Sequence, residues 1–268
     1  MRERVLTAVL LASLTMSALA STAIWPIILF GGVVILLGSR EIARLFGAPS
    51  PVFTVCAALA LYGFFLAPLR EGRNPPWLST IPLGFSLVGI GIAYLRARNA
   101  NRNYPFAPLE VLWLVGPVLA LVLLHRHRLG DGRFRLENVA LMALIPVWVG
   151  DITAIFVGRQ FGRHLIAPSI SPKKTVEGAV ANLSACIFAA ALTGQWLGFS
   201  LAPALLCGLI GGTLGQLGDL FESYIKRQAG MKDSGSLLPG HGGILDRIDS
   251  LLFTTPGVLI VLSFWPSP

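Results

Sequence analysis

Apolar residues occur in long runs along most of the chain, and short polar segments separate these runs. Each run is about 17 to 25 residues long, which is the length an α-helix needs to cross the hydrocarbon core of a bilayer. Strand-like alternation, typical of a membrane β-barrel, is not seen, and a helix satisfies its own backbone hydrogen bonds in lipid. The sequence therefore predicts an all-α polytopic membrane protein with about nine transmembrane helices, near residues 5–22, 24–39, 52–69, 78–95, 107–125, 138–158, 178–195, 197–217 and 251–265.

Composition agrees with this class. Apolar residues make up 54% of the 268 residues, and the mean hydropathy of +0.72 is too high for a soluble domain of this length. The opening stretch MRERVLTAVLLASLTMSALA also has the basic start and apolar middle of a cleavable signal peptide. We expect it to be retained as the first membrane anchor.

The basic residues are distributed unequally between the two sides of the predicted helix array. The N-terminus and the loops after the even-numbered spans carry 15 of the 21 Lys and Arg residues. Basic loops face the cytoplasm, so we expect these segments on the cytoplasmic side of the inner membrane. The net charge of +8 favours contact with anionic lipid headgroups. Nucleic-acid binding is not expected, because the chain has no soluble basic domain with interleaved aromatic residues.

The chain divides into two functional regions. Residues 1–136 consist of apolar spans joined by short loops, and they carry no recognisable chemistry, so we interpret them as a scaffold. Residues 137–268 form a catalytic region with polar loops. Asp151 lies roughly 10 Å inside the sixth span, counted at 1.5 Å per residue. An ionisable residue at this depth either faces a water-filled cavity or pairs with a basic group of a neighbouring helix.

The segment SPKKTVEG begins the seventh predicted helix. Ser171 followed by Pro172 is typical of an N-cap and a first helical residue. This assignment puts Lys173 and Lys174 in the first turn, where the helix dipole disfavours cations. A bound anion would offset the conflict, because helix N-termini favour phosphate. We expect at least one of the two lysines to contact phosphate, while the other can be an ordinary cytoplasmic lysine.

The segment GDLFESYIKRQ (218–228) predicts a helix with one polar stripe, formed by Asp219, Glu222, Ser223 and Lys226. For Glu222 this pattern is equally typical of a solvated surface helix. Asp219 differs, because it directly follows an apolar, glycine-rich run. In that run Gly211 and Gly215 have the spacing that lets membrane helices approach closely.

The segment KDSGSLLPGHGGILDRIDS (232–250) gathers charges in an otherwise apolar chain. The glycines of PGHGG let backbone amides form an anion-binding nest. Asp246 and Asp249 are three residues apart on the next helix, so their carboxylates share a face, with Arg247 to the side. With Asp219 from another helix, they suit Mg²⁺, which is usually held by one or two carboxylates and substrate phosphates.

Basic residues around this segment could neutralise phosphate oxygens, namely Lys226, Arg227, Lys232 and Arg247. The pattern favours phosphoryl or nucleotidyl transfer at the membrane surface. A structural network of salt bridges is the alternative, but it would need neither the glycines nor this density of charge.

Residues 223–249, SYIKRQAGMKDSGSLLPGHGGILDRID, closely resemble the signature of phosphatidate cytidylyltransferases, also called CDP-diglyceride synthases. SPKKTVEG resembles a second motif of the family, with Val176 where an aromatic residue is common. GDITAIFVGRQFG resembles a third, with Thr153 and Ile155 in place of the usual Gly and Tyr. The resemblance covers about residues 147–265.

The resemblance implies a Mg²⁺-dependent enzyme that converts CTP and phosphatidic acid in the bilayer into CDP-diacylglycerol and pyrophosphate. It implies that Asp219 and Asp246 hold the metal, and the spacing adds Asp249. Asp233 and His241 are expected near the nucleotide or the pyrophosphate. The remaining candidate residues are Lys226, Arg227, Lys232 and Arg247 for catalysis, and Asp151, Lys173, Lys174, Ser223, Gly242 and Gly243 for substrate binding.

Three other functions use part of the same pattern. A transporter or channel could use Asp151, Asp219 and Asp246 as an ion pathway. A lipid kinase that uses CTP would also need phosphate-binding loops and a metal. A CDP-alcohol phosphotransferase is disfavoured, because its spaced aspartate-glycine-alanine-arginine motif does not occur in the sequence. A homodimer is left open.

Overall fold

The computed structural model describes residues 2–21, 23–48, 50–70, 76–99, 107–126, 138–238 and 242–265. Within these residues, helices occur at all nine positions predicted from the apolar runs. They are α1 (Arg2–Ala20), α2 (Trp25–Leu45), α3 (Pro51–Arg70), α4 (Ile81–Asn99), α5 (Leu112–Arg126), α6 (Leu141–Phe161), α7 (Val176–Trp196), α8 (Leu201–Gln228) and α9 (Leu245–Ser263). Two short 3₁₀ helices, η1 (Pro76–Ser79) and η2 (Ala107–Val111), precede α4 and α5.

Seven of the described helices, α2 to α8, are long and apolar enough to cross a membrane. The described apolar part of α1, Val9–Ala20, is shorter, and α9 carries Asp246, Arg247 and Asp249 in its first two turns. A mostly helical fold with seven candidate membrane-spanning helices is therefore confirmed, whereas nine crossings stay a prediction. The largest difference in length concerns α8. It continues to Gln228, so the polar stripe predicted for residues 218–228 lies on the same helix as the eighth span.

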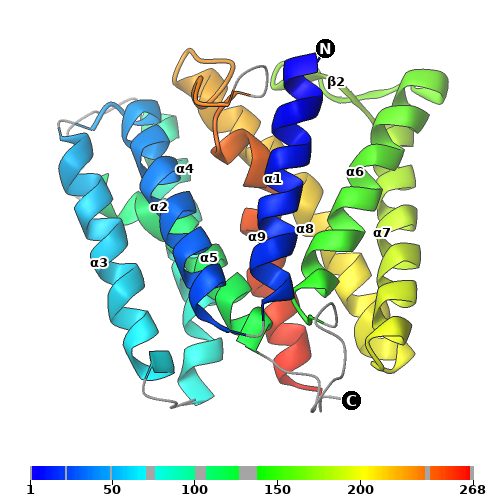
Figure 1. Ribbon diagram of the computed structural model, residues 1–268. Coiled ribbons are helices and arrows are strands. Elements are labelled where there is room, and N and C mark those ends of the chain that lie inside the picture. Colours follow the sequence, from blue (N-terminus) through cyan, green and yellow to red (C-terminus); the bar gives the residue numbers. More distant parts are fainter. Residues whose placement is uncertain are drawn as a thin grey trace.

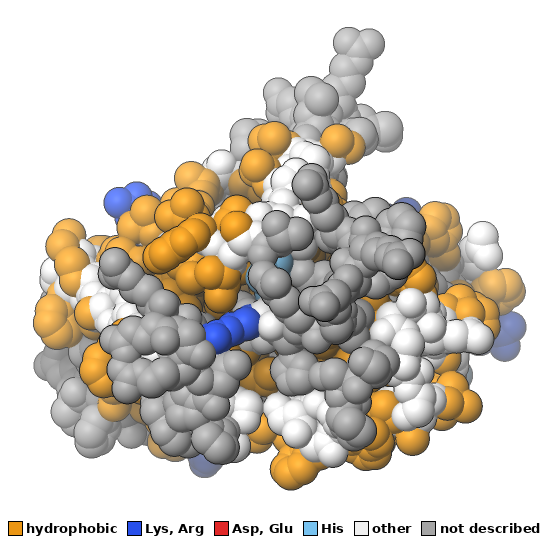
Figure 2. Space-filling model, turned by 60° about the horizontal axis from the view of Figure 1, so that its bottom comes forward, with side chains coloured by type: hydrophobic (Ala, Val, Ile, Leu, Met, Phe, Trp, Pro, Cys, Tyr) orange, Lys and Arg blue, Asp and Glu red, His pale blue; other side chains and the backbone are white. Residues whose placement is uncertain are grey.

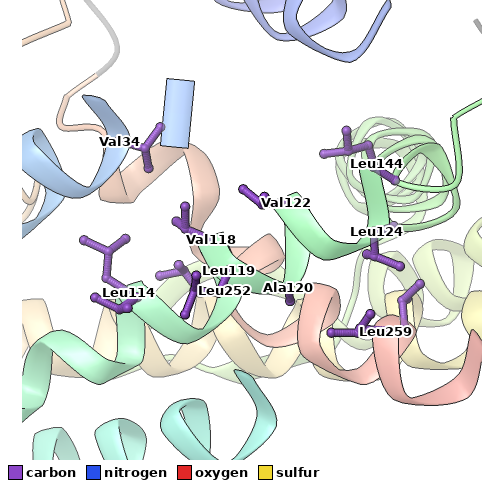
Figure 3. Packing of buried hydrophobic residues seen from close by; sticks show 14 of the residues in the cluster. Val34, Leu114, Val118, Leu119, Ala120, Val122, Leu124, Leu144, Leu252 and Leu259 are labelled. Carbon is purple, nitrogen blue, oxygen red and sulfur yellow. The ribbon is translucent and has the colours of Figure 1, made fainter. Parts of the chain in front are cut away.

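The helices form two groups, with α2 to α5 on one side and α6 to α8 on the other, while α1 and α9 lie between them (Figure 1). Buried side chains of α5 make up much of the core, together with residues of α2, α6 and α9 such as Val34, Leu144 and Leu252 (Figure 3). These buried apolar side chains form the core in the middle of the helix array. Charged and polar side chains gather at one end of the array, where α8 ends and α9 begins. Among the described residues at the opposite end, apolar side chains predominate in Figure 2.

Close packing of α8 on α7 depends on glycines. A Cβ atom added at Gly208 would lie 2.6 Å from the Cα atom of Ile187, and one at Gly212 would lie 2.7 Å from that of Leu183. A Cβ at Gly211 or Gly215 would come no closer than 3.3 Å to any neighbour. Gly211 and Gly215, noted in the sequence for their spacing, face α6 and α9 in looser contact. Helix α8 presents the neighbouring pair, which has the same spacing, to α7.

Candidate active site

Lys226, in the last turn of α8, lies between two carboxylates. Its Nζ atom is 3.1 Å from Oε1 of Glu222 and 2.5 Å from Oδ1 of Asp246 at the start of α9. Glu222 has an exposed fraction of 0%, so its interpretation as a solvated residue is wrong. The reason is that α8 is longer than predicted and packs its polar stripe against α9. Lys226 thus compensates protein carboxylates here, rather than facing open solvent.

Asp246 is held by the loop that precedes α9. Its Oδ2 atom accepts hydrogen bonds from the backbone N–H of Ser234 (2.9 Å), the hydroxyl of Ser234 (3.0 Å) and the backbone N–H of Gly243 (2.8 Å). Asp246 lies in the first turn of α9, outside the seven candidate spans. Burial raises the pKa of its carboxyl, but the hydrogen bonds from Lys226 and Gly243 outweigh burial and lower the pKa below its ordinary value. Asp246 is therefore a charged residue whose two oxygens are already bound by protein donors.

Glu41 of α2 is a residue of this site that the sequence analysis missed. It is 3% exposed, and its carboxylate accepts hydrogen bonds from the backbone N–H groups of Ile244 (2.9 Å) and Leu245 (3.0 Å). It also accepts from the Ser234 hydroxyl (2.7 Å), whose single proton it shares with Asp246. These two amides begin α9 and would otherwise lack partners. A residue of the N-terminal region thus fixes the start of the helix that carries Asp246, although residues 1–136 were interpreted as a scaffold without chemistry.

Two glycines make room for this arrangement. Gly242 has a φ of +78°, a conformation that favours glycine, and a Cβ there would lie 2.5 Å from Oδ2 of Asp246. A Cβ at Gly243 would overlap both the Ser234 hydroxyl and the Glu41 carboxylate. The predicted anion nest is occupied in part by a protein anion, since the Gly243 amide points at Asp246. Pro239, Gly240 and His241 lie outside the described residues.

We refer to Glu41, Glu222, Lys226 and Asp246 as the loop-anchoring group. A second set of charges, the Asp219 group, comprises Asp151 of α6, Lys174, Asp219 of α8 and Asp249 of α9. The Lys174 Nζ atom is 2.6 Å from Oδ2 of Asp219, and the two side chains are 25% and 35% exposed. Asp151 and Asp249 each lie within electrostatic reach of Asp219.

Few protein donors reach the carboxylates of the Asp219 group. Asn182 donates to Asp151 over 3.1 Å, the backbone N–H of Ser250 donates to Asp249 over 2.7 Å, and Ser223 is 3.5 Å from Asp219. Three carboxylates with one lysine leave an excess of negative charge, which suits a cation with oxygen ligands. Within the described residues, however, no three His, Cys, Asp or Glu side chains are arranged closely enough to enclose a metal by themselves.

The expected pairing of Asp219 with Asp246 is not the arrangement seen. Because α8 and α9 run in opposite directions (Figure 1), Asp219 lies near Asp249, while Asp246 contacts Lys226, two turns further along α8. The carboxylates of Asp219 and Asp246 bind different partners. The assignment of all three aspartates as metal ligands stays a prediction.

The structure contradicts the helix start predicted at Ser171. Residues Ser171–Thr175 form strand β2, which pairs with β1 (Leu165–Ala167) in an antiparallel hairpin. Helix α7 begins at Val176, and its N-cap is Thr175, whose hydroxyl accepts a hydrogen bond from the amide of Gly178. Both Ser171 and Thr175 are good N-cap residues, and pairing with β1 favours the second.

This hairpin directs the two lysines differently. Neighbouring side chains of a strand point to opposite faces, so Lys174 reaches Asp219 while Lys173 is exposed. Neither lysine lies in the first turn of a helix. The helix dipole therefore does not call for an anion beside these lysines, and Lys174 is paired with Asp219 instead.

The remaining predicted residues surround the two groups. The Arg227 guanidinium donates to the carbonyl oxygens of Ile170 (3.3 Å) and Met231 (3.1 Å), and so it ties the hairpin to the end of α8. Lys232 and Asp233 are exposed on the loop. Arg247 is exposed and lines a separate, apolar cavity.

Comparison with known proteins identifies the family of the chain. A model described as the cytidylyltransferase family matches residues 2–265. A phosphatidate cytidylyltransferase of Staphylococcus aureus (strain COL) is 32% identical over 245 residues, which cover 88% of this chain and 93% of the relative.

Two other relatives with the same name are more similar over a shorter region. The protein of Synechocystis sp. is 46% identical over 121 residues, 44% of this chain and 41% of the relative. The protein of Staphylococcus saprophyticus is 46% identical over 124 residues, 46% of this chain and 48% of the relative. In these two alignments the chain spans less than half the length of the relatives.

Proposed function

The chain belongs to the cytidylyltransferase family, and we propose that it is a phosphatidate cytidylyltransferase, which converts CTP and phosphatidate into CDP-diacylglycerol and pyrophosphate. The observation that carries the proposal is the similarity to the S. aureus enzyme over 93% of that protein's length. The end of the helix array where α8 finishes supports it, because carboxylates and lysines with exposed side chains lie there next to apolar helices.

In the proposed reaction, an oxygen of the lipid phosphate attacks the α-phosphorus of CTP. The bond between the α-phosphorus and the bridging oxygen breaks, and pyrophosphate leaves. Catalysis of this step consists mainly of alignment and charge neutralisation. Lys173 is exposed on β2 next to Lys174, and Lys232 is exposed on the loop after α8, so they are suited to bind phosphate oxygens. No covalent bond to the protein is needed.

Mg²⁺ is part of the proposal. Asp219 and Asp249 would hold it, because they come from adjacent helices and their charge is incompletely compensated. When bound, the metal would act as a Lewis acid that neutralises charge on the phosphates. Asp246 would bind the metal through Oδ1 only by giving up its ion pair with Lys226.

We also propose that this end of the protein faces the cytoplasm, with nine helices crossing the inner membrane. The excess of basic residues on the segments at this end supports the orientation. CTP would then arrive from the cytoplasm, while the lipid keeps its acyl chains in the bilayer.

A product analysis tests the function. Purified protein in detergent is given CTP, phosphatidate and Mg²⁺, and lipid products and pyrophosphate are quantified. We expect CDP-diacylglycerol and pyrophosphate in equal amounts, and no product when a chelator removes the divalent metal. Release of CDP with a newly phosphorylated lipid would instead identify a kinase, and absence of any turnover would refute the proposal.

A further inference from the structure

An apolar cavity of about 260 Å³ lies between α1, α2, α5, α6 and α9. Its walls include Leu11, Val34, Val118, Leu144 and Leu252, and all of these except Leu11 are labelled in Figure 3. Helix α1 lies in front of α9 in Figure 1 and closes one side of the cavity. Both carboxylate groups of the candidate active site lie outside it.

Among the described residues that line this cavity, Arg247 is the only charged one. Its side chain is exposed, and within the described residues it makes neither an ion pair nor a hydrogen bond. A ligand with an anionic head and an apolar tail would complement this site, because the head would pair with the guanidinium while the tail filled the apolar cavity. Arginine binds phosphate with two parallel hydrogen bonds.

Helix α9 separates the cavity from the carboxylates. Ile244, Arg247, Leu251 and Thr255 recur at intervals of three or four residues and line the cavity, so they form one face of α9. Asp246 contacts α8 instead. Between Arg247 and Thr255 the helix rises about 12 Å at 1.5 Å per residue. The cavity is thus long enough to hold a substantial part of an acyl chain, and the Arg247 guanidinium lies at the end near the start of α9.

We propose that this cavity binds one acyl chain of a lipid whose headgroup is an unsubstituted phosphate, and that Arg247 binds this phosphate, whose charge no choline offsets, at the rim. The identification of this lipid as the substrate phosphatidate rests on the proposed function. A phosphate bound to Arg247 lies at the first turn of α9, although the side chains of Arg247 and Asp246 point to different faces of this helix. An apolar peptide would fill the cavity equally well but would leave the guanidinium without a partner.

The experiment measures lipid binding without catalysis. The full chain is reconstituted in phosphatidylcholine nanodiscs that contain phosphatidate with a photoreactive group in one acyl chain, and no CTP is added. After irradiation, labelled peptides are identified by mass spectrometry. We expect labels on the cavity-lining parts of α1 and α9. Photoreactive phosphatidylcholine with the same acyl chains should label these peptides far less.

A matched pair of substitutions makes the test specific. Leu11→Trp places an indole in the cavity, while Leu10→Trp changes the neighbouring residue, which is 57% exposed and does not line the cavity. We expect Leu11→Trp to abolish cavity labelling and to raise the KM for phosphatidate but not for CTP, and Leu10→Trp to resemble the wild type. Arg247→Gln should weaken labelling roughly tenfold, as expected for the loss of one charge-assisted interaction, and Arg247→Lys should weaken it less.

Labelling that is equal in Leu11→Trp and wild type, or equal for the two lipids, would overturn the proposal. The outcome is distinguishable from failure of the proposed function. A protein that does not make CDP-diacylglycerol but shows the expected labelling would refute the enzyme activity and leave the lipid site intact. Normal activity with labels confined to other helices would refute the lipid site and leave the proposed enzyme activity intact.

Discussion

The two charged groups of the candidate active site differ in how completely the protein binds their carboxylates. In the loop-anchoring group, Asp246 accepts hydrogen bonds at both oxygens, and Glu41 accepts three. Lys226 and Asp246 there have side-chain exposures of 10% and 5%. In the Asp219 group, Lys174 and Asp219 are 25% and 35% exposed, and fewer donors reach each carboxylate. The two groups are therefore expected to have different roles, although both lie at the candidate active site.

A carboxylate that is fully bound by protein donors and one that is partly free have different functions. A buried carboxylate saturated by protein donors stabilises one loop conformation, and removing it leaves those donors unpaired. A partly exposed carboxylate near other carboxylates gains from a cation. Asp246 belongs to the first kind and Asp219 to the second, although the family resemblance implies the same role for both.

The largest expected effect contrasts Asp219→Asn with Asp246→Asn. We expect Asp219→Asn to lower kcat more than the roughly 10–100-fold that is typical of outer-shell partners of a metal. Its stability should change by less than about 1 kcal/mol, because the ion pair with Lys174 is partly exposed. Asp246→Asn should abolish activity and also lower the free energy of unfolding by about 3 kcal/mol, because it breaks a buried ion pair.

Turnover and denaturant-induced unfolding of the purified variants check this contrast. Metal binding gives a third readout: Mg²⁺ should raise the melting temperature of wild type but not of Asp219→Asn. If both variants lose activity with unchanged stability, Asp246 acts on ligands rather than on the loop, and the distinction drawn here fails.

The apolar runs in the sequence predicted the position of every described helix, because a membrane helix needs about 20 apolar residues in succession. Features that depend on contacts between elements, such as which glycines of α8 meet α7 and which residue caps α7, were not predicted. Gly208 and Gly212 have the same spacing as Gly211 and Gly215, and only the rotation of α8 decides which pair meets α7. Likewise, the pairing of β1 with β2 selects Thr175 over Ser171 as the N-cap.

The site was predicted only where its residues are close in sequence. Lys226 does contact the segment 232–250, through its ion pair with Asp246, whereas its contact with phosphate oxygens stays a prediction. Glu41 was missed because it contacts Ser234, 193 residues away, and no local pattern encodes such a contact. One signal was present in the sequence, namely an acidic residue two positions after the second apolar run. Its cost in a membrane protein points to a partner.

A smaller effect is expected from Glu41→Gln, which tests whether the N-terminal region acts on the site. The amide keeps the size of the side chain but replaces one accepting oxygen with an NH₂ group, so at least one donor of the loop loses its partner. We expect a loss of about 2 kcal/mol in the free energy of unfolding, and kcat lowered by roughly tenfold through displacement of Asp246.

Glu110→Gln provides the matched control for Glu41→Gln. Glu110 is also a buried carboxylate of the N-terminal region, and it pairs with Arg96 at 2.6 Å rather than with the loop before α9. We expect it to lower stability while the kcat of the folded fraction stays at the wild-type value. Equal losses of kcat in both variants would show that general destabilisation, rather than the loop, explains the effect of Glu41.

The smallest expected effect is the pH dependence of the stability that Asp246 contributes. The pKa of Asp246 is lower in the folded protein than its ordinary value, so the folded state holds the proton less tightly than the unfolded state. Its contribution is therefore complete above the unfolded pKa of about 3.9 and is lost as the pH falls through the folded pKa. The stability difference between wild type and Asp246→Asn should accordingly be constant from pH 7 to 5 and shrink below about pH 4.

Leu252→Ala, which removes a buried apolar side chain, should keep a constant difference from wild type over the same range in denaturant unfolding. If the Asp246→Asn difference also stays constant, the carboxylate is not held in its charged form by the loop, and the two groups do not differ in the way their contacts indicate.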